Sequence, residues 1–190
     1  MPQDFNWIQF FATCGVILIG VISAVITYQM GKKTLMKKSL EDEQKEIYKK
    51  LNDFYGPLGL LRGKSERIYR IFSKRFKKKD AEFRTLNYIM TQGRTALTEN
   101  EQALLQQILD IGAKVEDLVV TKSGLIDEPE LSNQLARLLA HTSILKLAYE
   151  GHLKGDPAEF NDATFPRELD KYIASKVEQL QRRLEEIKKV

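Results

Sequence analysis

The sequence predicts an all-α protein, with one N-terminal transmembrane helix followed by an antiparallel bundle of four to five amphipathic helices. Two observations carry this prediction. No Asp, Glu, Lys or Arg occurs between Asp4 and Lys32. Beyond Lys32 the apolar residues recur at steps of three and four, which is the period of a helix. Only 5 of the 190 residues are proline, so few positions interrupt a helix.

The apolar segment from Phe5 to about Met30 is long enough to cross a bilayer, because a spanning helix needs roughly 20 apolar residues. A cleaved signal peptide would require a basic segment before the apolar stretch, and the N-terminal MPQD has none. A lipoprotein signal would place its cysteine after the stretch, whereas Cys14 precedes most of it. The candidate anchor residues, with aromatic rings near both ends as at membrane interfaces, are Trp7, Phe10, Phe11, Ile17, Leu18, Ile19, Val21, Ile22 and Tyr28.

Positive charges directly after this segment predict its orientation. The lysines are Lys32, Lys33, Lys37 and Lys38, whereas only Asp4 precedes the segment. Lys and Arg concentrate on the cytoplasmic side of a membrane. We therefore expect a single-pass protein of the inner (cytoplasmic) membrane with its N-terminus outside. Residues 1–31 form the tail and transmembrane helix, and residues 32–190 form a cytoplasmic helical domain.

Charge divides the expected cytoplasmic domain into two parts. Residues 32–79 contain 16 Lys and Arg and 6 Asp and Glu, a net charge of +10. Residues 80–190 contain 14 and 19, a net charge of −5. We expect a basic, membrane-proximal helix over 32–79 and an acidic bundle over 80–190.

The basic helix contains a candidate hinge. Pro57 removes a backbone hydrogen bond and Gly56 loosens the turn, so a kink is predicted there, although a fold-back is left open. The candidate hinge or docking residues are Phe54, Tyr55, Gly56, Pro57 and Leu58. The alternative is that the apolar members are core residues packed around the kink.

The acidic region carries start and stop signals for its helices. A short helix is expected from Asp80 to about Thr91, with Gly93 as its stop. Thr98 and Glu101 have the spacing of a capping box, which opens the next helix.

Pro129 and Pro166 mark the starts of two later helices, and Gly151 ends the first of them. The last helix has an apolar stripe, Leu169, Ile173, Val177, Leu180, Leu184 and Ile187. The period of this stripe suits bundle packing and equally a coiled coil with a second copy.

The end of the basic helix is a candidate binding face formed by Arg67, Arg70, Lys74, Arg75, Lys77, Lys78 and Lys79. A basic amphipathic helix binds anionic lipid or nucleic acid, unless its charges are solvated or paired with the acidic half. A straight helix over 32–79 extends ~70 Å from the membrane at ~1.5 Å per residue, whereas screening confines the lipid field to ~8 Å. Lipid contact therefore requires a fold-back or a helix that lies along the surface.

We expect no catalytic, cofactor or metal site. The two histidines, His141 and His152, lack further ligands at metal-binding spacing. The only thiol, Cys14, lies in the apolar segment. No nucleophile elbow and no phosphate-binding glycine loop occurs, so the sequence gives no reason to expect an enzyme.

The N-terminal span, the string Leu51–Leu58 and the string Phe165–Leu169 before the last helix resemble small bacterial single-pass membrane proteins with a helical cytoplasmic domain. The resemblance covers most of the chain and implies no activity for any residue. We expect a membrane-anchored interaction or scaffold module that contacts the lipid bilayer and binds a protein partner, and a homo-oligomer is left open. The alternatives are an effector or enzyme with a site built from scattered polar residues, and a tether for anionic lipid or nucleic acid.

Overall fold

All regular structure in the described part of the chain is helical. The computed structural model describes the backbone of residues 7–160 and 162–189, and the side chains of Gly20, Ser23 and residues 26–160 and 162–189. The α-helices are α1 (Trp7–Lys50), α2 (Gly56–Lys77), α3 (Thr85–Gln92), α4 (Glu99–Thr121), α5 (Pro129–Tyr149) and α6 (Leu169–Lys188). The all-α prediction is confirmed.

The chain forms two compact units, residues 1–46 and residues 47–190. The first consists of most of α1, and its described side chains up to Ser39 are exposed. The second holds the end of α1 and all later helices. It therefore includes the acidic region and most of the segment that the sequence assigns to a basic helix.

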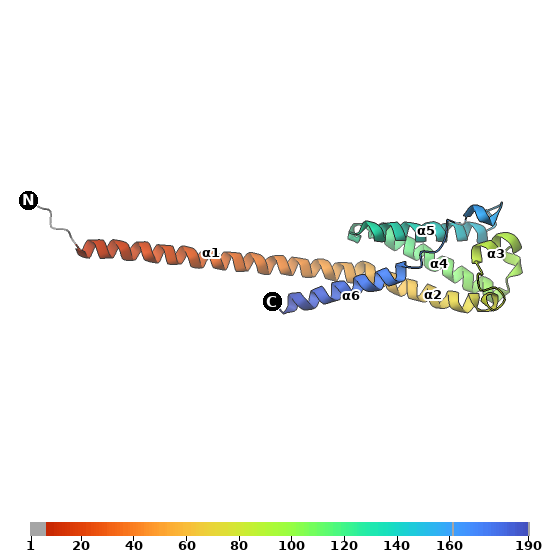
Figure 1. Ribbon diagram of the computed structural model, residues 1–190, viewed down its shortest axis with the longest axis horizontal. Helices are drawn as coiled ribbons and strands as arrows, with labels where there is room; N and C mark the ends of the chain where they lie inside the picture. Colours follow the sequence, from red (N-terminus) through yellow and green to blue (C-terminus); the bar gives the residue numbers. More distant parts are fainter. Residues whose placement is uncertain (1–6, 161, 190) are drawn as a thin grey trace, which may run out of the picture. The chain divides into compact units, whose positions relative to one another are not determined.

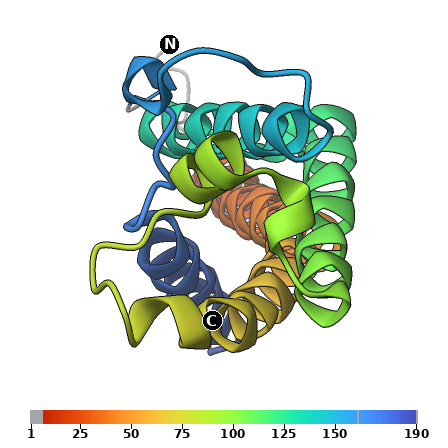
Figure 2. The same ribbon diagram turned by 90° about the vertical axis from the view of Figure 1, so that its right-hand side faces the viewer.

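In the second unit, α2, α4, α5 and α6 alternate in direction along the chain (Figure 1). They lie around one interior, and α3 covers its end (Figure 2). The longest helix-to-helix packing is between α2 and α4. This arrangement is the antiparallel bundle that the four amphipathic stripes predict.

A π turn, η1 (Leu51–Tyr55), joins α1 to α2 without a break in the helical backbone. Because Pro57 has no N–H, a regular α-helix would lack one bond here. The wider turn instead bonds the Gly56 N–H to the Leu51 carbonyl, five residues back. A Cβ at Gly56 would lie 2.8 Å from that carbonyl oxygen, so the turn requires glycine. The chain does not fold back here: the helix continues to Lys77.

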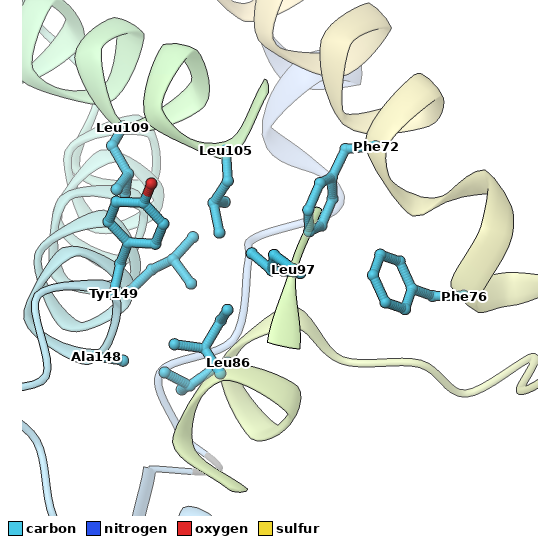
Figure 3. Close-up of a cluster of buried hydrophobic side chains, with 10 residues drawn as sticks. Phe72, Phe76, Leu86, Leu97, Leu105, Leu109, Ala148 and Tyr149 are labelled. Atoms are coloured by element: carbon cyan, nitrogen blue, oxygen red, sulfur yellow. The ribbon is translucent and has the colours of Figure 1, made fainter. Parts of the chain in front are cut away.

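A cluster of the bundle's buried apolar side chains lies where α3 covers the interior (Figure 3). Leu97 and residues from four helices meet there: Phe72, Phe76, Leu86, Ile89, Leu105, Leu109, Leu145, Ala148 and Tyr149. The Phe76 ring stacks on Phe83 at 4.5 Å and meets Tyr88 edge-on at 4.9 Å. Aromatic packing therefore fixes the C-terminal end of α2.

The helices α4 and α5 approach most closely at Gly112. A Cβ built there would lie 2.2 Å from the Thr142 Cγ2 atom. Thr142 also donates its hydroxyl hydrogen to the Leu138 carbonyl at 3.0 Å. Only a residue without a side chain fits this crossing, so Gly112 is required by packing and not by backbone conformation.

The helix boundaries test the start and stop signals. The capping box of Thr98 and Glu101 is confirmed, with both of its hydrogen bonds present. Gly93 ends α3 with a φ of 76°, as predicted. The expected start at Asp80 is wrong: the Asp80 carboxylate accepts the Glu82 N–H and holds a turn, so α3 begins only at Thr85.

The last helix also begins later than predicted. Pro166 lies in a turn in which the Leu169 N–H donates to the Pro166 carbonyl, and α6 starts at Leu169. Its predicted apolar stripe is buried, apart from the half-buried Val177.

Candidate functional site

The predicted membrane anchor lies mostly outside the described side chains. Of its residues, Trp7, Phe10, Phe11, Ile17, Leu18, Ile19, Val21 and Ile22 lie there, whereas Tyr28 is described and exposed. Within the described residues, no helix carries an apolar stretch long enough to cross a membrane. The four orientation lysines, Lys32, Lys33, Lys37 and Lys38, lie on α1 and are exposed.

The predicted hinge and docking residues divide into two groups. Phe54, Tyr55 and Leu58 are fully buried, so the docking interpretation is not supported and these side chains form core. Gly56 and Pro57 shape the π turn described above. This placement agrees with the alternative drawn from the sequence, in which the apolar members are core residues packed around the kink.

Buried charges surround the π turn. Lys50 donates to Asp127 at 3.0 Å, and Lys176 pairs with Glu128 and lies 4.0 Å from Asp127. The two lysine side chains are only 13 and 10 % exposed. Burial acts to raise the pKa of Asp127, but the Lys50 hydrogen bond and the two lysine charges outweigh it and hold that pKa below its usual value. These pairs tie the start of α5 to α1 and α6.

The Tyr55 hydroxyl faces this charged group but makes no hydrogen bond within the described structure. Burial raises the pKa of Tyr55 above its ordinary value, and the negative charges of Asp127 and Glu128 raise it further. The hydroxyl therefore stays protonated. A buried polar group without a partner costs free energy, so this residue destabilises the π turn that it helps to fill.

A second ion pair, partly buried, lies on α2 about two turns beyond the π turn. Arg62 donates Nε to one oxygen of Asp170 at 3.0 Å and Nη2 to the other at 3.1 Å. The guanidinium carbon also lies 4.4 Å above the centre of the Phe165 ring. This bidentate geometry is the strongest form of the Arg–carboxylate contact. Sequence analysis placed Arg62 at no site, because its partners lie about a hundred residues away.

His141 completes this second cluster. Its Nδ1 lies 2.8 Å from the Ala163 carbonyl oxygen, so this nitrogen carries the hydrogen in the bonded tautomer. Its ring meets Phe165 edge-on at 5.9 Å. Burial lowers the pKa of His141 and the charge of Arg62 lowers it further, which together outweigh the hydrogen bond to Ala163. His141 is therefore a half-buried, neutral side chain that packs between Phe165 and the Ala163 carbonyl.

The predicted basic face is exposed, but its members differ in their contacts. Arg70 pairs with Glu66 at 3.1 Å and Arg75 pairs with Glu101 at 2.8 Å. Lys77 lies over the Tyr69 ring at 5.3 Å. The remaining members, Arg67, Lys74, Lys78 and Lys79, are exposed and have no acidic partner among the described residues. The second group is available to bind an anionic partner.

Three members of this face lie on a regular line with three further residues of α2. We call this line the α2 ridge: Leu60, Lys64, Arg67, Ile71, Lys74 and Lys78. Its steps of four and three residues place all six on one side of α2. Every member is exposed, and Leu60 and Ile71 are 78 % and 64 % exposed. The opposite side carries the buried residues, among them Phe72 and Phe76. The ridge thus combines four cations with two bare aliphatic side chains.

Other chemistry has little support in the described residues. Their His, Cys, Asp and Glu side chains form no group of three that fits a metal ion. His152 lies on the surface, with its Nδ1 3.4 Å from the Glu150 carboxylate, and it belongs to no such group among the described residues. The two charged clusters are already paired internally, so they present no vacant acid or base for catalysis.

Comparisons with protein-family models, with curated proteins and with solved structures find no match. The resemblance to bacterial single-pass proteins therefore gains no support from them. A functional conclusion must rest on the residues of this chain.

Proposed function

We propose that this protein is a membrane-anchored interaction module that presents a binding surface, the α2 ridge, at the cytoplasmic face of a membrane. The observation that carries the proposal is the exposure of this ridge. Cations at four of its six positions attract a negatively charged partner. The two exposed aliphatic residues supply apolar surface that a bound partner would remove from water.

The rest of the bundle supports the same function. The aromatic core and the two buried ion-pair clusters hold α2 at both ends, so the ridge is presented on a rigid helix. A rigid surface loses little conformational freedom when it binds, and this favours affinity. In this proposal the two ion-pair clusters position α2 and take no part in catalysis.

Membrane attachment is the other half of the proposal and rests on the sequence. The run from Phe5 to about Met30 contains no charged residue. Lysines follow it at the predicted cytoplasmic end. Deletion of residues 1–31 should release the chain from membranes into the soluble fraction. Retention of the full chain in membranes after alkaline carbonate extraction is the expected result, and its release would contradict the anchor.

The binding surface is tested with two charge-reversed chains of equal net charge. One carries Lys64→Glu, Arg67→Glu and Lys74→Glu in the ridge. The control carries Lys146→Glu, Lys154→Glu and Lys189→Glu, which are exposed and lie outside the ridge.

The tagged full-length chains are extracted from native membranes in mild detergent, and the proteins that co-purify are quantified. We expect the ridge variant to lose its partners and the control to keep them. Equal recovery with both variants would show that the ridge is not the binding surface. A loss of bound lipid or nucleic acid without loss of protein would favour the tether function instead.

A further inference from the structure

A second exposed ridge, on α4, has the opposite charge. Its members are Glu99, Ala103, Gln106, Asp110, Ala113, Asp117 and Val120, all exposed and again at steps of four and three residues. Three are acidic, and Val120 is 65 % exposed. We call this line the α4 ridge. Among the described residues, the acids of this ridge form no salt bridge, and Asp110 accepts a hydrogen bond from Gln106 within the same ridge at 2.9 Å.

We propose that the α2 ridge of one molecule binds the α4 ridge of a second copy of this chain. The inference rests on the proposed function, because it takes the same α2 surface and names its partner. Charge complementarity is the first argument: the α2 ridge carries four cations and the α4 ridge carries three carboxylates. Opposite charges at matching helical spacing guide the choice of partner.

The spacing of side chains gives the second argument. Leu60 and Ile71 are eleven residues apart, about 16 Å along a helix, and Ala113 and Ala103 are ten residues apart, about 15 Å. An antiparallel pairing that sets Ile71 against Ala103 therefore brings Leu60 close to Ala113. Large side chains then meet small ones, which lets two helices approach closely.

The same antiparallel register pairs the charges. With Ile71 opposite Ala103, Lys64 lies opposite Asp110, and Lys74 lies opposite the first turn of α4, where Glu99 is found. A parallel pairing that matches Lys64 with Glu99 would place Leu60 beyond the start of α4. A parallel pairing that sets Leu60 opposite Ala103 also places Arg67 opposite Asp110 and Lys74 opposite Asp117. The two ridges therefore match in either direction, and the spacing of the side chains does not select one.

Nucleic acid and lipid fit the α2 ridge less well. Single-stranded nucleic acid needs aromatic side chains on which bases stack, and the aromatic rings of α2 point into the bundle, with Phe72 and Phe76 buried and Tyr69 packed against them. A membrane-surface helix needs a broad apolar face, whereas the ridge has two aliphatic residues separated by cations. Neither ligand would use the α4 ridge.

The two ridges lie on different helices, so every molecule carries both halves of the contact. Two copies can pair reciprocally about a two-fold axis, or they can pair head to tail, in which case further copies add until a ring closes or a row extends. On a membrane such assembly would place many bundles side by side.

The test uses four full-length chains in mild detergent. They are the wild type, an α2 variant (Lys64→Glu, Arg67→Glu, Lys74→Glu), an α4 variant (Glu99→Lys, Asp110→Lys, Asp117→Lys) and the chain with all six changes. Molar mass is measured by light scattering over a range of concentrations and at two salt concentrations. Helix content from circular dichroism checks that each chain folds, which is expected because all six positions are exposed.

We expect concentration-dependent growth of the wild type that weakens at high salt, since exposed charges are screened. Each three-residue reversal should weaken association at least about tenfold, because it converts attraction into repulsion. The six-residue chain should associate again. A mixture of the α2 and α4 variants should associate where neither variant does alone, because the unchanged ridges of the two chains are complementary and so are the two reversed ridges.

A wild type that stays monomeric at all concentrations would overturn the inference. Equal association of all four chains would overturn it too, because the contact would then lie elsewhere, for example between the N-terminal segments. The proposed function fails by a different result: co-purifying partners that are unchanged by reversal of the α2 ridge. A monomeric wild type whose partners still depend on that ridge would refute self-association and retain the interaction module.

Discussion

The two ends of α2 are held in the bundle by different kinds of contact. At the C-terminal end, Phe72 and Phe76 pack among apolar side chains of α3, α4 and α5. At the N-terminal end, the neighbours of the helix are ion pairs, an unbonded Tyr55 hydroxyl and the Arg62–Asp170 contact. Apolar packing tolerates small changes of register, whereas a bidentate ion pair has one geometry. The apolar end therefore supplies stability, and the polar end specifies where the helix sits.

The largest expected effect is at the apolar end. Phe72→Ala should lower the free energy of unfolding by about 3–5 kcal/mol, because it removes a fully buried ring and leaves a cavity. Urea titration followed by circular dichroism measures the loss. Hydrogen exchange should show that protection falls first in α3 and the start of α4, and an even loss over the whole bundle would contradict the division into two ends.

At the polar end, Asp170→Asn should cost about 1–3 kcal/mol, because Arg62 is buried and loses its charged partner. The matched control on the same helix is Glu178→Gln, which breaks an exposed contact to Arg182 at 3.6 Å. Exposed pairs contribute little, so the control should stay within about 0.5 kcal/mol of the wild type. Equal losses in the two variants would mean that the Arg62 pair does not fix the helix.

Two glycines near the π turn should respond with opposite signs to the same change. Gly56→Ala should destabilise the bundle by about 1–3 kcal/mol, because the added Cβ meets the Leu51 carbonyl oxygen at 2.8 Å. Gly59→Ala should stabilise it by about 0.5–1 kcal/mol, because the site is open and alanine favours helix. Thermal unfolding of the two variants measures the difference. Stabilisation by both would show that the π turn relaxes readily to an α-helix.

The polar and apolar ends each contain a buried tyrosine, and the two tyrosines differ in whether the hydroxyl has a hydrogen-bond partner. Tyr55→Phe should raise stability by about 1 kcal/mol, because the buried hydroxyl that it removes has no partner. Tyr149→Phe should lower it by about 0.5–1.5 kcal/mol, because that hydroxyl donates to the Gln102 carbonyl at 3.2 Å. Urea midpoints of the two variants should therefore move in opposite directions, and a loss of stability in Tyr55→Phe would reveal a partner for its hydroxyl.

The polar end alone should respond to mild acid. The pKa of His141 is lower in the folded chain than its ordinary value of 6.5, so below about pH 6.5 the unfolded chain binds the proton more readily. Stability contributed by neutral His141 is therefore lost as the pH falls from 6.5 toward the folded-state pKa. His141→Gln should flatten this part of the stability profile, whereas His152→Gln, at an exposed site, should leave it unchanged.

Local signals in the sequence were enough to predict the apolar and capped parts of the fold. The Thr98 and Glu101 capping box acts over three residues, and the apolar stripe of the last helix acts within one helix, so both are readable without knowledge of the partner. The buried Leu169, Ile173 and Leu180 of α6 follow for the same reason. The anchor prediction stands on sequence alone, because most of its side chains lie outside the described residues.

The polar end was not predictable, because its contacts join distant segments. Arg62 reads as one more cation of a basic helix, and only the fold brings Asp170 and Phe165 to it. The buried side of α2 also includes Ser65, and an apolar stripe does not mark polar residues in a core. The α2 ridge was not predicted for another reason: the seven cations lie close together in the sequence, whereas exposure and pairing divide them.

The π turn can also be regarded as one residue inserted into an otherwise regular helix. Removal of Asn52 would let the backbone bonds close four residues apart and rejoin the flanking helices as an α-helix. Each residue of an α-helix turns it by about 100°, so the deletion would rotate Lys50 away from Asp127 by about that angle while α2 stayed in its core. A single codon therefore decides whether the end of α1 keeps Lys50 in reach of Asp127, at a place where no other side chain needs to change.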